Sequence, residues 1–167
     1  MGSTPTAITI RNTIKTKLET VDASASVTSG ADSWTFNRNL VDSVTHGGDP
    51  RANADASASA ALHLRSIEQR PGASLGDLLT TAFFEVYARS VPTSNTAEKR
   101  AEAAYELAGD ISAALQQGDR TLGGIVRTVA MQIEARDGQG DPEHEWAAGC
   151  GLVIVRIETT WANRLGT

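Results

Sequence analysis

A run of strict alternation between apolar and polar residues limits what this chain can fold into. From Ala82 to Ala88, within the segment Thr81–Val91, every second residue is apolar: Ala82, Phe84, Val86 and Ala88. Successive side chains of a β-strand point to opposite faces, so this pattern predicts a strand with one face buried. Pro92 ends the strand, because proline has no N–H to donate to a sheet ladder. The fold is therefore built around a sheet that is covered on one face.

The segment after Pro92 changes to the helical period. Asn95 followed by Glu98 predicts a capping box at a helix N-terminus, and Gly118 predicts a cap at its C-terminus. We expect a helix over Thr96–Gln117. Its buried stripe is predicted to consist of Ala101, Ala104, Ala108, Ile111 and Leu115. The small alanines allow such a helix to lie close to a sheet.

The other elements follow the same two periods. We expect a helix from Thr6 to about Thr20, a short strand around Trp34–Phe36, a loop over His46–Ala56, and strands over Ala60–Glu68, Ile125–Ile133 and Ala147–Thr160. Asp22–Gly30 has no clear pattern. The prediction is one α+β domain spanning residues 1–167, with a single mixed or antiparallel sheet. Two main helices pack on one face of this sheet, in the order α-β-β-β-α-β-β.

Composition narrows the function. Cys150 is the single cysteine, which excludes an intramolecular disulfide. The net charge is −5 with acids and bases dispersed, so the basic stripe needed to grip duplex DNA is missing. The longest apolar run, Leu152–Val155, is too short to span a bilayer, which takes about 20 residues. We expect a soluble protein made in the cytoplasm.

The sharpest enzyme hypothesis is a small serine hydrolase that uses Ser74. Gly72-Ala73-Ser74-Leu75-Gly76 matches a nucleophile elbow, and His46-Gly47-Gly48 is similar to an esterase oxyanion motif. His144 could complete the set, although no acid stands out. An elbow joins a strand to a helix, whereas here Pro71 precedes the motif and a strand follows it. A glycine-rich turn between strands explains these residues better.

The sequence gives little indication of metal-dependent or thiol chemistry. His144-Glu145 begins a zinc-protease motif, but Ala148 stands where the second histidine is required. Asp141, Glu143, His144 and Glu145 could hold a cation loosely, and a solvated acidic turn explains them better. No activating base is evident near Cys150, so we expect Cys150 to be a small buried residue. We therefore expect no catalytic, cofactor-binding or metal-binding residues, and no cofactor.

The second half of the chain resembles bacteriophage tail terminator proteins, also called tail completion or minor tail proteins. The resemblance rests on the strand Thr81–Val91, the alanine-rich helix, and the lead-in Asp119–Val126, which includes Leu122-Gly123-Gly124. The closing strand Gly151–Thr159 and the opening helix with Ile10, Ile14 and Leu18 extend it over most of the chain. The segment Asp22–Ala56 has no counterpart.

The resemblance implies a virion protein without enzymatic activity. Such a protein forms a ring, usually hexameric, at the head-proximal end of the tail. The ring ends polymerisation of the tail tube protein, joins the tail to the head-side connector or stopper, and lets DNA pass through its lumen. Another head–tail connector or stopper protein is the nearest alternative. A closed ring needs a head-to-tail interface, and we expect His46–Ala56 and Asp137–Glu145 to contact a neighbouring subunit or tail component.

Overall fold

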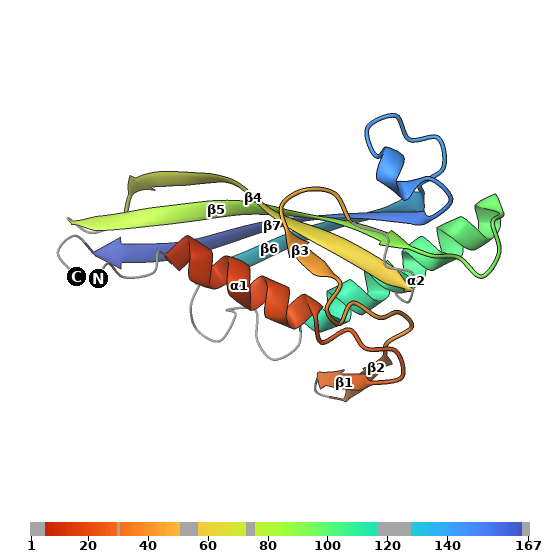
Figure 1. Cartoon of the computed structure of the whole chain (residues 1–167). Helices are drawn as coiled ribbons and strands as arrows, with labels where there is room; N and C mark the ends of the chain where they lie inside the picture. The colour runs from red at the N-terminus through yellow and green to blue at the C-terminus, as the bar shows by residue number, and fades with distance from the viewer. Residues whose placement is uncertain (1–5, 30, 51–56, 73–75, 117–127, 165–167) are drawn as a thin grey trace.

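The main layer of the molecule is a five-stranded mixed sheet (Figure 1). The computed structural model describes residues 6–29, 31–50, 57–72, 76–116 and 128–164. In sheet order the strands are β3 (Val44–His46), β4 (Ala58–Pro71), β5 (Asp77–Ser90), β7 (Gly151–Arg164) and β6 (Thr128–Asp137). β3 runs parallel to β4, and every other neighbouring pair is antiparallel. The predicted α+β class and mixed sheet are confirmed.

The long strands pair over most of their length. β5 and β7 match without a break from Asp77 opposite Arg164 to Ser90 opposite Gly151. β4 and β5 pair from Ala58 to Pro71, with a bulge between Leu64 and Ser66. The predicted end of β4 near Glu68 was therefore too early. Proline is tolerated at a strand end on the edge of a sheet, which is where Pro71 lies.

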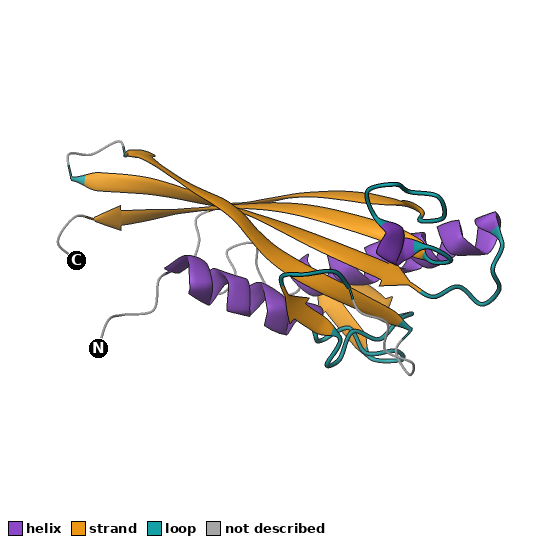
Figure 2. Ribbon diagram, turned by 45° about the horizontal axis from the view of Figure 1, so that its top comes forward, coloured by secondary structure: helices purple, strands orange, loops and turns teal. Residues whose placement is uncertain are grey.

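Both helices lie on the same side of the sheet (Figures 1 and 2). α1 spans Thr6–Leu18 and buries its apolar stripe, which includes Ile10 and Ile14. α2 spans Ala97–Gln116 and contacts β6 and β7. A Cβ atom on Gly151 of β7 would lie 2.5 Å from the amide nitrogen of Ala104, so the helix backbone rests directly on this strand. None of the described helices is long and apolar enough to cross a membrane.

The core fills the space between the helices and the sheet. Its largest fully buried side chains come from both helices, from β4 and β5 and from the segment between α1 and β3: Phe84, Ile10, Ile14, Leu18, Leu40, Leu62, Leu107 and Ile111. Burying one such side chain contributes about 1.5–3 kcal/mol. The alternation predicted for β5 is confirmed, because Ala82, Phe84, Val86 and Ala88 are buried and the residues between them are half-buried.

A short hairpin packs beside α2 and was not predicted as such. β1 (Ser26–Ser29) and β2 (Asp32–Thr35) form a separate two-stranded sheet. With these strands and β3, five strands precede α2 instead of the predicted three. The hairpin is held by Asp110 of α2, which is fully buried. Its carboxylate accepts hydrogen bonds from Trp34 Nε1 at 2.8 Å and from the Arg38 amide at 2.8 Å.

Two details of α2 differ from the prediction. Thr96 caps the helix, because its Oγ1 accepts the Lys99 amide at 3.2 Å, whereas Asn95 Oδ1 accepts from the Arg100 side chain. The capping box of Asn95 and Glu98 was therefore wrong. The buried stripe is also rotated, since Leu107 is buried and the predicted residue Ala108 is only half-buried. The hairpin packs against the helix and shifts the face that is covered.

Candidate functional site

One face of the sheet is not covered by the helices and is the candidate functional surface. We call it the open face. It carries the alternate residues of β4, β5, β7 and β6 that point away from α1 and α2. A turn over residues 138–150, which contains a short 3-10 helix (Glu145–Ala147), lies above one end of it (Figure 1). The middle of the open face consists of His63, Arg65, Phe83, Glu85, Tyr87, Gln132, Glu134, Arg156 and Glu158.

Charges of opposite sign alternate across the open face. Arg65 Nε of β4 lies 3.4 Å from Glu85 Oε1 of β5, and Arg156 of β7 lies 3.9 Å from Glu134 of β6. Glu134 also accepts from Arg136 at 2.9 Å. These pairs are exposed, and each contributes about 1 kcal/mol or less to stability. Their effect is to leave this surface polar and nearly balanced in charge.

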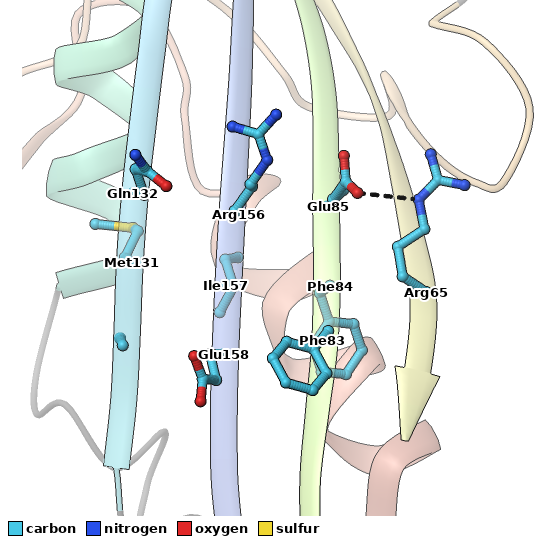
Figure 3. A pocket seen from close by; sticks show the side chains of 10 residues that line it. Arg65, Phe83, Phe84, Glu85, Met131, Gln132, Arg156, Ile157 and Glu158 are labelled. Carbon is cyan, nitrogen blue, oxygen red and sulfur yellow. Dashed lines mark ion pairs between the residues drawn. The ribbon is translucent and has the colours of Figure 1, made fainter. Parts of the chain in front are cut away.

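A shallow hollow of roughly 390 Å³ lies in the middle of the open face. Figure 3 shows the charged side chains of Arg65, Glu85, Arg156 and Glu158 around it, with the ring of Phe83. Ala130, Met131 and Gln132 of β6 line its other side. Its polar groups are dispersed around the rim, so nothing in this arrangement singles out a nucleophile and its base.

An aromatic cluster joins the open face to the turn above it. Tyr87 lies 5.2 Å from His63, 5.4 Å from His144 and 6.1 Å from Trp146, measured between ring centres. Together with Ala147, Leu152 and Ile154, the rings of Tyr87 and Trp146 form a small second core. The turn is therefore packed on the sheet.

The Tyr87 hydroxyl is held from two sides. It accepts from Arg65 at 2.6 Å and donates to Glu85 at 2.7 Å. Burial and the hydrogen bond to Glu85 raise the pKa of this phenol. The guanidinium carbon of Arg65 is 5.3 Å from the ring centre, but the bond to the hydroxyl places it beyond the ring edge. A hydrogen bond describes this contact better than a cation–π interaction.

Asp141 anchors the base of the turn. Its carboxylate pairs with Arg136 at 2.5 Å and accepts from the amides of Glu143 and His144 and from the His144 ring. Burial opposes ionisation, but these partners outweigh it and lower the pKa of Asp141 to about 2. The cation hypothesis for this turn is thereby weakened, because the carboxylate oxygens already have partners. In the described part of the chain, no group of three or more His, Cys, Asp or Glu side chains could hold a metal ion.

The remaining candidate residues are not brought together. Cys150 is a buried free thiol whose pKa is raised by burial, the opposite of what a nucleophile requires. His63 Nε2 is hydrogen-bonded to the carbonyl oxygen of Gly48 at 2.8 Å, so the pair Gly47-Gly48 lies against β4. His46 ends β3 and His144 packs on Tyr87. Ser74, Gly118, Leu122, Gly123 and Gly124 lie outside the described residues.

Sequence patterns missed the contacts between the turn and the sheet. Tyr87, His144 and Trp146 are each polar-face or loop residues, and no spacing connects them. Comparison with known proteins adds no relative: no protein-family model matches the chain, and no curated protein matches it.

Proposed function

We propose that this protein is a structural component of a bacteriophage virion that forms a ring on the tail tube. The ring ends tube polymerisation, joins the tail to the head-side connector or stopper and lets DNA pass through its lumen. The element series β5, α2, β6 and β7 carries this proposal, because the resemblance to tail terminator proteins rests on that series. The protein acts through contacts between subunits and has no catalytic role.

The open face supports the proposal through its charge. A lumen wall formed by the open face carries balanced ion pairs, such as Arg65 with Glu85 and Arg156 with Glu134. Such a wall does not hold a polyanion by counterion release. The overall charge of −5 acts in the same direction. DNA can therefore pass such a wall without being gripped.

The test is tail-tube length. Purified tube protein is polymerised with and without this chain, and tube lengths are measured by negative-stain electron microscopy. We expect the chain to stop elongation and to appear as a ring at one tube end. Tubes that grow to the same length in its presence, with no ring at either end, would refute the proposal.

A matched variant tests the enzyme hypothesis at the same time. Ser74→Ala removes the one serine placed in an elbow-like motif, and we expect it to stop tube growth as well as the wild type. An esterase activity of the wild type that disappears in Ser74→Ala would instead favour a hydrolase.

A further inference from the structure

The main sheet has one outer edge on β6 and another, on its opposite side, on β3 and β4. β6 is the last strand on one side, and none of the described residues pairs with its outer edge. On the other side, β3 pairs with β4 only at Ala60, Ala61 and Leu62. The outer edge of β4 beyond His63 has no strand partner among the described residues. Unpaired strand edges are templates for pairing with another chain.

The directions of the strands fit a head-to-tail contact. β4, β5, β7 and β6 are antiparallel in succession, so β4 and β6 run in opposite directions. A second copy placed in the same orientation next to the first brings its β4 beside β6 of the first. The junction is then antiparallel, like the three junctions within each chain, and the sheet continues with the same faces on the same sides.

The side chains at the two edges match on the helix side. Ile67 of β4 is 49% exposed, although its cross-strand partner Ala82 is fully buried. Ile133 and Ala135 of β6 are half-buried at the rim of the core. In an antiparallel pairing with Gln69 opposite Ala135, Ile67 of one copy lies diagonal to Ala135 of the next and Pro71 lies opposite Ile133, which extends the apolar layer.

The charges match on the open face. β4 carries Glu68 and Arg70, and β6 carries Glu134 and Arg136, in the same order and two residues apart. In an antiparallel pairing, Glu134 faces Arg70 and Arg136 faces Glu68. A parallel pairing would place like charges opposite each other, which is unfavourable.

We infer that β6 of one subunit pairs with the β4 segment 67–71 of the next, as a head-to-tail contact between copies of this chain. This inference rests on the proposed function, since a closed ring uses two different edges of each subunit. A two-fold dimer through β6 alone would leave β4 unpaired.

The first experiment exchanges the charges on β4. Glu68→Arg with Arg70→Glu places like charges opposite β6, and both positions are exposed, so the fold is retained. We expect the dissociation constant of self-association, measured by light scattering over a concentration series, to rise about tenfold or more. The same exchange leaves a two-fold β4–β4 contact complementary and does not touch a β6–β6 contact. An unchanged constant therefore overturns the inference.

The second experiment traps the contact in a Cys150→Ala background. Gln69→Cys and Ala135→Cys are placed in one chain, and the protein is oxidised at high concentration. We expect a ladder of disulfide-linked chains, with a yield about tenfold or more above that of the control pair Tyr105→Cys and Ala135→Cys, because pairing raises the effective concentration of the thiols. Tyr105 is exposed and lies on α2, so it belongs to neither edge strand. A yield equal to the control overturns the inference.

A third variant removes the apolar contact. Ile67→Asp should abolish assembly and keep the fold, as judged by circular dichroism, while Val41→Asp, at another exposed apolar position, should leave assembly unchanged. If chains with altered β4 edges still form rings and stop tube growth, the edge pairing is refuted and the proposed function stands. If the wild type neither forms rings nor affects tubes, the proposed function fails as well.

Discussion

Asp110 shows how one buried carboxylate connects parts of the chain that are far apart in sequence. It lies on α2, is fully buried and accepts from the Trp34 ring, from the Asn37 side chain and from the amides of Asn37 and Arg38. Asp110 is the acceptor that these donors share, and it is buried although Trp34 and Asn37 are exposed. A hydrogen bond to a charged group contributes about 1.5–3 kcal/mol.

We therefore expect Asp110→Ala to lower the free energy of unfolding by about 2–4 kcal/mol, with several donors losing their acceptor at once. Urea denaturation followed by circular dichroism measures the loss. Glu102→Ala is the control, because Glu102 is on the same helix and pairs with Lys99 at the surface. Equal stability of the two variants would show that the Asp110 contacts are not formed.

Asp141 makes the stability depend on acid pH. Its pKa in the folded protein is about 2, below its ordinary value of 3.8, so the ionised carboxylate stabilises the fold above about pH 4. This contribution is lost as the pH falls toward about 2. We expect Asp141→Asn to melt at a lower temperature than the wild type at pH 6, and the difference to shrink by pH 2. A difference that stays constant with pH would contradict the assignment.

At the scale of elements, the contact between α2 and β7 leaves no room for a side chain at Gly151. An added Cβ would lie 2.5 Å from the Ala104 nitrogen and 2.6 Å from the Arg100 carbonyl oxygen. These are backbone atoms of a helix, so relief requires that the helix moves away from the sheet. We expect Gly151→Ala to cost about 1–3 kcal/mol in urea denaturation, the usual range for overpacking. Ala148→Ser, at an exposed position near the same strand, should change stability little.

The sequence predicts those elements whose burial follows their own period. β5 and α2 were predicted to within a few residues because one face of each is buried throughout. β1 was not predicted, since Val27 is its one half-buried apolar residue, between exposed Ser26 and Thr28, and a single residue sets no period. The hairpin is held instead by a side chain of α2. Asp110 lies within the buried stripe of its helix, and a charged residue in that position was a signal for a specific partner.

The candidate surface was predictable only in part. The residues Glu85, Tyr87 and Arg89 were correctly placed on the face away from the core. The packing of the turn on this face was not predicted, because His144 and Trp146 contact Tyr87 from more than fifty residues along the chain. Local sequence patterns carry no information on such contacts. They form because the folded sheet brings β5 and the turn together.

The whole molecule is acidic, and the arginines at the centre of its open face stand beside glutamates. At a net charge of −5, with Arg65 near Glu85 and Arg156 near Glu134, we expect the isolated protein not to bind duplex DNA at physiological salt. Fluorescence anisotropy of a labelled duplex measures this. Tight binding by the wild type would contradict a lumen through which DNA slides.

Removing the acids of the open face should create the binding that the wild type lacks. Glu85→Gln, Glu134→Gln and Glu158→Gln together leave the arginines without their acidic neighbours and bring the net charge from −5 to about −2. We expect this variant to bind duplex DNA at low salt and to lose affinity steeply as salt is raised, because the gain comes from released counterions. The matched control replaces three acids on α2, Glu98, Glu102 and Glu106, and has the same net charge. Equal binding by both variants would show that net charge, and not the open face, controls contact with DNA.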